Sequence, residues 1–147
     1  MAFKEVVING VTVRIHRMSA KTQHDIVNRF ILPVMDFASE IEVEDGGDRT
    51  AALKGLLKGI NKYLPPEKRD ELLFNYLVSP EYVKVLAASM EVPFCQNGLI
   101  QCEALDGAKY IYQIAAVAFV FNFEDFFSGW DSILSEAMAI VNSKKST

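Results

Sequence analysis

The sequence is poor in the side chains that most often carry metal or covalent chemistry. Its 147 residues include two cysteines and two histidines. A zinc site needs three or four nitrogen or sulfur ligands close together, whereas Cys95 and Cys102 have six residues between them and lie far along the chain from His16 and His24. Two cysteines are also too few for a disulfide-built framework. We therefore expect no metal ion and no other cofactor.

The motifs of common enzyme sites are missing as well. The chain has no Gly-x-Ser-x-Gly turn of the kind that presents a nucleophilic serine. The Gly46-Gly47 pair lacks the further glycines and the lysine of a phosphate-binding loop. A catalytic nucleophile also needs a base held by an orienting group, and no such combination is evident. The sequence predicts a protein that is not an enzyme.

Excess positive charge and long apolar segments are absent too. Fifteen Lys and Arg against nineteen Asp and Glu give a net charge of −4, which disfavours binding to nucleic acid or to anionic lipid. The longest strictly apolar run is the eight residues 114–121, while a membrane-spanning helix needs about 20. No basic segment followed by an apolar one opens the sequence. We expect a soluble, intracellular protein without nucleic-acid or membrane partners.

What the sequence does contain is apolar surface for one core. Half of the residues are apolar, and the length suits one domain. No internal repeat or linker divides the chain. We expect a single domain over residues 1–147, with a β-hairpin at 1–17, a helical body at 19–142 and a polar tail at 143–147.

The opening segment has the pattern of a β-hairpin. Two β-branched runs, 3–8 and 11–17, flank Asn9-Gly10, the dipeptide that best tolerates the positive φ angles of a type I′ turn. With this turn, the numbers of paired residues sum to 19. One face of the hairpin is then apolar and must pack on a helix or on a partner chain; it comprises Val6, Ile8, Val11, Val13 and Ile15.

Apolar periodicities predict helices over most of the remaining chain. They lie close to residues 20–32, 50–63, 66–78, 80–89, 105–121 and 124–142. Ser19 is placed to cap the first helix, and the segment 105–121 is apolar on nearly every side, as in a helix buried all round. For 90–104 a second hairpin and a loop both remain open, and the loop is favoured. The expected fold is mainly α, a single helical domain with an N-terminal β-hairpin.

Two surface features are candidates for binding a partner. Lys54, Lys58 and Lys62 follow the polar side of the predicted helix 50–63 at i, i+4 spacing, which indicates either a solvated face or an electrostatic site for an acidic partner. The second feature is a dense aromatic cluster near the C-terminus. It is either ordinary core or an apolar patch that receives another protein's helix; the candidate partner-binding residues are Phe119, Phe123, Phe126, Phe127 and Trp130.

The segment between the two predicted C-terminal helices carries capping residues. Asn122 is placed to cap the last helix, and Asp125 lies in the first turn of that helix, where negative charge is favoured by the helix dipole. These two residues are expected to hold the last two helices at a fixed angle.

The segment from Leu105-Asp106-Gly107-Ala108 to Phe121-Asn122-Phe123-Glu124-Asp125-Phe126-Phe127 resembles the tail assembly chaperones of long-tailed bacteriophages. Members often carry a mostly apolar helix that ends in an Asn-Phe-x-Asp-Phe-Phe-like sequence and is followed by a last helix. The N-terminal hairpin that leads into a helix is also similar.

This resemblance implies a non-enzymatic role in the cytoplasm of the host cell. Such a chaperone binds the tape measure protein, keeps it soluble and assists assembly of the tail tube. The implied partners are the tape measure protein, the major tail tube protein and a frameshift-extended form of the chaperone itself. Two alternatives remain open: a structural component of the virion, such as a tail-terminator or head-tail connector subunit, and a small regulatory protein of the host.

Overall fold

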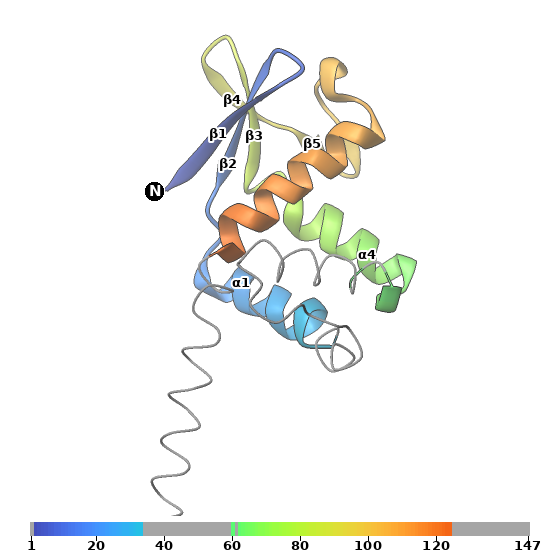
Figure 1. The fold of residues 1–147 in the computed structure, drawn as a ribbon. Helices are drawn as coiled ribbons and strands as arrows, with labels where there is room; N and C mark the ends of the chain where they lie inside the picture. Colours follow the sequence, from blue (N-terminus) through green and yellow to red (C-terminus); the bar gives the residue numbers. More distant parts are fainter. Residues whose placement is uncertain (1, 34–59, 61, 125–147) are drawn as a thin grey trace, which may run out of the picture.

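The computed structural model describes residues 2–33, 60 and 62–124. Within them, a four-stranded antiparallel sheet of order β1-β2-β3-β4 packs one face against helices (Figure 1). The strands are β1 (Phe3–Ile8), β2 (Val11–His16), β3 (Val83–Ala87) and β4 (Met90–Pro93). A separate two-stranded sheet consists of β5 (Cys95–Gln96) and β6 (Leu99–Ile100).

The longer helical segments of the described residues come from three regions of the chain, and residues 60, 62 and 63 are helical as well. Helix α1 (Ala20–Ile26) continues into the π-helical turn η1 (Val27–Ile31). Helix α4 (Pro66–Leu72) likewise continues into the π-helical turn η3 (Leu73–Leu77). A short 3₁₀ turn, η4 (Glu103–Leu105), precedes a helix over residues 108–124, which crosses the fold between the sheet and α4 in Figure 1.

The predicted N-terminal hairpin is confirmed together with its register. The pairs run from Phe3 opposite His16 to Ile8 opposite Val11, so each pair sums to 19. Val13 and Ile15 of the expected apolar face are fully buried, and Val6, Ile8 and Val11 pack against the same core. The turn works as expected, because Asn9 and Gly10 have φ angles of 49° and 77°.

The prediction of a mainly α, all-α fold is wrong, because the sheet has four strands and residues 80–89 do not form a helix. Residues 83–87 form β3, which pairs with β2 on one side and β4 on the other. Val83 and Val85 point into the core, and Lys84 between them is half-buried. This alternation has the period of two that strands require, but over so few residues it also fits a helical pattern.

The favoured loop at 90–104 is also wrong. Residues 90–93 form β4, and β5 and β6 form a second hairpin around Asn97-Gly98. The dipeptide at this turn has φ angles of 54° and 77°, as in the first hairpin. The β3–β4 turn is different, since Ala88 and Ser89 adopt φ angles of 51° and 68° without being residue types that favour them.

Two of the predicted helices agree with the structure, and others lie outside the described residues. Residues 20–32 and 66–77 are helical, and the Ser19 hydroxyl accepts a hydrogen bond from the backbone N–H of Thr22 at 3.2 Å, as an N-cap does. The predicted helices 50–63 and 124–142 fall almost wholly outside the part of the chain that the structure describes. The predicted helix 105–121 is observed at 108–124.

Asn122 connects regions that are 104 residues apart in the sequence. Its Oδ1 accepts a hydrogen bond from the backbone N–H of Met18 at 2.8 Å, and its Nδ2 donates to the carbonyl of Ala118 at 2.9 Å. Met18 lies between β2 and α1, and both residues are buried. Asn122 therefore differs from the expected N-cap: it lies inside a helix and ties that helix to the end of the hairpin.

The Asn122→Ala variant is expected to lose about 1–3 kcal/mol of unfolding free energy, because the buried Met18 N–H loses its acceptor. Chemical denaturation measures this loss. The control is Gln113→Ala, at an exposed position of the same helix, which should change stability by less than about 0.5 kcal/mol. Equal stabilities of the two variants would show that the Met18–Asn122 bond does not hold the fold together.

The double variant Ala88→Asn, Ser89→Gly is expected to be about 1 kcal/mol more stable than the native chain. Asparagine and glycine accept positive φ at lower cost than alanine and serine. The matched opposite change is Gly10→Ala, which meets no neighbouring atom and so destabilises through its φ of 77° alone. Thermal melts compare the variants, and a double variant that melts below the native chain contradicts the expectation.

Candidate functional site

An apolar groove lies between α4–η3 and the helix 108–124. In Figure 1, α4 is the green helix on the right, and the helix 108–124 is the orange one that crosses the molecule. Its volume is about 580 Å³, within the range of about 300–1,000 Å³ usual for binding sites. The lining residues are Ile60, Pro66, Arg69, Asp70, Leu72, Leu73, Leu77, Tyr112, Ala115, Ala116 and Phe119.

The groove follows from helical periodicity on both of its sides. On the α4–η3 side, Pro66, Leu73 and Leu77 recur at intervals of seven and four residues. On the other side, Tyr112 and Phe119 are seven residues apart. Residues at such intervals share one helix face. Each helix therefore presents a stripe of its own to the space between them.

Both small and large side chains line the groove. Ala115 and Ala116 leave room for a backbone to approach closely, and Ala116 is exposed. Leu72 and Phe119 also line the groove, and both are buried. Tyr112 is 65% exposed, and tyrosine is among the residues enriched at protein interfaces. The shape and chemistry suit the apolar face of a helix.

Arg69 is the charged residue that stands out in this groove. Its Nε is buried and has no hydrogen-bond partner in the structure. The neighbouring acidic residue Glu71 is engaged elsewhere, since it forms ion pairs with Arg29 and with Lys68. A buried donor without an acceptor is uncommon in native proteins, so this position calls for an explanation.

Of the aromatic residues predicted as a partner-binding patch, two are described by the structure and three are not. Phe119 lines the groove, but it is only 1% exposed. Phe123 is equally buried, and its ring lies 5.0 Å from that of Phe119. In the described structure these two residues belong to the core and do not form a surface patch. Phe126, Phe127 and Trp130 lie outside the described residues.

Most of the remaining predicted site residues also lie outside the described part of the chain. This applies to Lys54, Lys58 and Asp125. Lys62 is exposed, and its Nζ lies 5.2 Å from the centre of the Tyr63 ring. The lysine stripe as an electrostatic site for an acidic partner remains a prediction.

Sequence reasoning missed Arg69, Tyr112 and Ala116 as site residues. The helix that contains Tyr112 was expected to be buried on every side, but Tyr112 and Ala116 are exposed. Their spacing of four residues was a usable signal, because it places both on one helix face. No sequence signal could show that the Arg69 side chain borders the groove, since this depends on how two helices distant in sequence pack.

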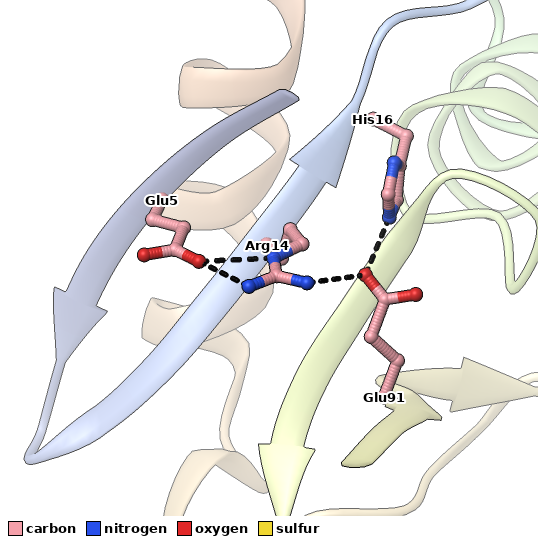
Figure 2. A network of polar contacts seen from close by, with 4 residues as sticks. All are labelled: Glu5, Arg14, His16 and Glu91. Carbon is pink, nitrogen blue, oxygen red and sulfur yellow. Dashed lines mark hydrogen bonds and ion pairs between the residues drawn. The ribbon is translucent and has the colours of Figure 1, made fainter. Parts of the chain in front are cut away.

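A second polar feature lies on the outer face of the sheet (Figure 2). Arg14 of β2 binds Glu5 of β1 through Nε at 2.9 Å and Nη2 at 2.5 Å, and its Nη1 lies 3.2 Å from Glu91 of β4. The same Glu91 oxygen contacts His16 Nε2 at 2.6 Å. The Arg14 guanidinium also lies 4.4 Å from the centre of the Phe3 ring. This network crosses the sheet from one edge strand to the other.

The network changes the acidity of Glu91. The hydrogen bond with His16 and the contact with Arg14 hold the pKa of the Glu91 carboxyl below its usual value. The side chain of Glu91 is 32% exposed, so solvent screens these interactions and limits their contribution to stability. The network is a surface brace between β1, β2 and β4.

No arrangement for metal chemistry is present within the described ranges. Among these residues, no group of three His, Cys, Asp or Glu side chains could hold a metal ion. Cys95 is buried, and burial raises the pKa of its thiol, which disfavours the reactive thiolate. Among the same residues, no helix has the length and apolar character to cross a membrane.

The Glu91→Gln variant is expected to be less stable than the native chain at pH 7, by at most about 1 kcal/mol. Because the folded-state pKa of Glu91 is lowered, its contribution to stability is present at neutral pH and is lost as the pH falls through that lowered pKa. Denaturation at pH 7 and pH 3 measures the difference. Glu103→Gln, an exposed glutamate outside the network, is the control. A difference that stays constant with pH argues against this role of Glu91.

Comparisons with protein-family models, with curated proteins and with solved structures give no match at the level of significance applied.

Proposed function

We propose that this protein is a non-enzymatic tail assembly chaperone that binds a helical segment of the tape measure protein. The observation that carries the proposal is the apolar groove between α4–η3 and the helix 108–124. The resemblance of the segment Asn122 to Phe127 to tail assembly chaperones names the client. Phe119, which lines the groove, and Asn122, the first residue of that segment, lie in the same described helix.

Binding in the groove would protect the tape measure protein from aggregation. A tape measure protein is a long chain with helical apolar faces, and it has no partner until the tube polymerises around it. Exposed apolar faces aggregate, and a groove that covers one stripe of such a helix prevents contact between chains. Burial of apolar area is insensitive to salt screening, so the complex should survive raised ionic strength.

The same proposal covers the other expected partners and the place of action. The chaperone acts in the cytoplasm of the host cell, where tails assemble. It helps recruit subunits of the major tail tube protein and works together with a frameshift-extended form of itself. No chemical step is needed for these tasks, because association and release alone determine which surfaces are covered.

Co-expression tests the proposal. A tape measure fragment from the same genome, insoluble when made alone, is expected to become soluble and to co-purify with this protein in low and in high salt. The Ala116→Arg variant should abolish co-purification, because its long, charged side chain occupies the apolar groove that Ala116 lines. Ala116 is exposed and arginine is a good helix former, so the free variant should fold.

The matched control is Gln113→Arg, which adds the same side chain at an exposed position of the same helix outside the groove. It should retain the client. If every segment of the tape measure protein remains insoluble with the native chain, the proposed function is wrong. If both arginine variants retain the client, the groove is not the binding site.

A structural virion component, such as a tail-terminator or head-tail connector subunit, is the second candidate. The observation that favours it is the four-stranded sheet, in which β1 and β4 are the edge strands within the described residues. Edge strands pair readily with strands of another chain, and such pairing builds rings. Light scattering on the purified chain separates the candidates, since a closed ring supports the virion component.

A further inference from the structure

The outer edge of β1 is a row of backbone groups without a hydrogen-bond partner among the described residues. In an antiparallel hairpin, every second pair of facing residues exchanges hydrogen bonds. The Arg17 N–H donates to the Ala2 carbonyl at 3.1 Å, and these two residues continue the register of the hairpin. The even-numbered residues of β1 therefore bond to β2. The N–H and C=O groups of Phe3, Glu5 and Val7 point away from β2, to the side of the sheet.

The opposite edge of the sheet, β4, is a poorer template for another strand. The Phe94 N–H donates to the Val83 carbonyl at 3.2 Å, in register with the β3–β4 pairs. By the same alternation, the β4 residues that face away from β3 are Glu91 and Pro93. Proline has no N–H, so β4 offers one outward donor where β1 offers three. Proline also hinders pairing at sheet edges. Addition of a strand is therefore expected at β1.

The edge of β1 is complementary to a second copy of itself. In an antiparallel pair centred on Glu5, Phe3 of each copy lies opposite Val7 of the other. The outward N–H and C=O groups of residues 3, 5 and 7 then all gain partners. Phe3 and Val7 are 46% and 71% exposed, and this pairing brings them together twice on the outer face. Apolar pairs across strands stabilise a sheet.

The charges of β1 also favour this register. Like charges directly opposite each other destabilise a sheet, and the pairing places Glu5 opposite its own copy. Each Glu5 is already bound by Nε and Nη2 of Arg14 on the neighbouring strand, so two arginines flank the two carboxylates and offset their repulsion. A pair centred on Lys4 instead faces two lysines with each other, and a pair centred on Val6 moves Phe3 away from Val7.

We propose that two copies of this protein pair along β1 in antiparallel orientation, with a two-fold axis at Glu5, and join their four-stranded sheets into one. Such a dimer is closed, because each β1 edge is used by the other copy. No residue of β1 lines the apolar groove, so each dimer keeps two grooves. The dimer does not depend on the proposed client, but two grooves would let it bind two segments of one long chain.

The first test compares Val7→Pro with the matched control Val7→Ala by sedimentation equilibrium of the full chain. The Val7 N–H has no partner among the described residues, so proline removes a donor between copies and none within the fold. Proline is accommodated in edge strands. The native chain and Val7→Ala should be dimers. Val7→Pro should dissociate at least about 10-fold more readily than Val7→Ala, because symmetry removes two donors from each dimer.

The second test locates the two-fold axis by cross-linking, and it does not require that Val7→Pro folds. Cysteines are introduced into a Cys102→Ser chain, since Cys102 is partly exposed and Cys95 is buried. Hydrogen-bonded facing residues lie about 5.5 Å apart, a Cα separation that a disulfide spans. Glu5→Cys should give a disulfide-linked dimer with oxidised glutathione. Val7→Cys should not, because the two copies of residue 7 lie four residues apart, about 13 Å along the strands.

The outcomes are decisive in both directions. A native chain that sediments as a monomer at its highest soluble concentration overturns the inference, and so does a ring of more than two copies. Equal dissociation of Val7→Ala and a folded Val7→Pro also overturns it. If Val7→Pro does not fold, the cross-link decides, and its absence at position 5 or its presence at position 7 overturns the proposed axis. None of these results depends on the groove, so the chaperone function is tested separately by co-expression.

Discussion

The bond between the Asn122 side chain and the Met18 backbone is the contact on which the arrangement of the described elements depends most. Met18 ends the hairpin and precedes α1, and Asn122 lies near the described end of the helix 108–124. A single buried amide therefore orients that helix relative to both sheet and α1. The groove has the same helix as one wall, so its shape depends on a bond formed by residues that do not line it.

The two faces of the sheet have separate roles. The inner face carries buried valines, including Val13, Val83 and Val85, and supplies the apolar area that stabilises the fold. The outer face carries the ion pairs around Arg14, which are screened by solvent and contribute little. Binding is proposed at neither face but between two helices, where the buried Arg69 Nε has no acceptor, at some cost to stability. Such a cost is common at functional sites.

Local chemistry explains which elements could be predicted. The first hairpin is encoded by Asn9-Gly10 and by alternation on both sides, so its register follows from neighbouring residues alone. The β3–β4 hairpin has Ala88-Ser89 at its turn, and this dipeptide gives no turn signal. Its strands exist because β2 supplies a pairing edge for β3, a partner about 70 residues away in the sequence. The strand propensity of residues 83–87 does not depend on this distant partner and therefore could not predict the pairing.

By itself the sequence determined the hairpin, two of the helices and the apolar helix that contains Phe119, because turn dipeptides and periodic apolar positions act within a few residues. The sequence also contains only two cysteines and two histidines, which are few ligands for a metal ion. Tertiary structure alone decided that 83–87 is a strand, that Phe119 and Phe123 are core, and that Asn122 bonds to Met18. It likewise decided that Arg69 borders a groove. The reason is that each of these features depends on which distant segment of the chain packs against the residue. That packing is set by the free energy of the whole fold and not by neighbouring residues.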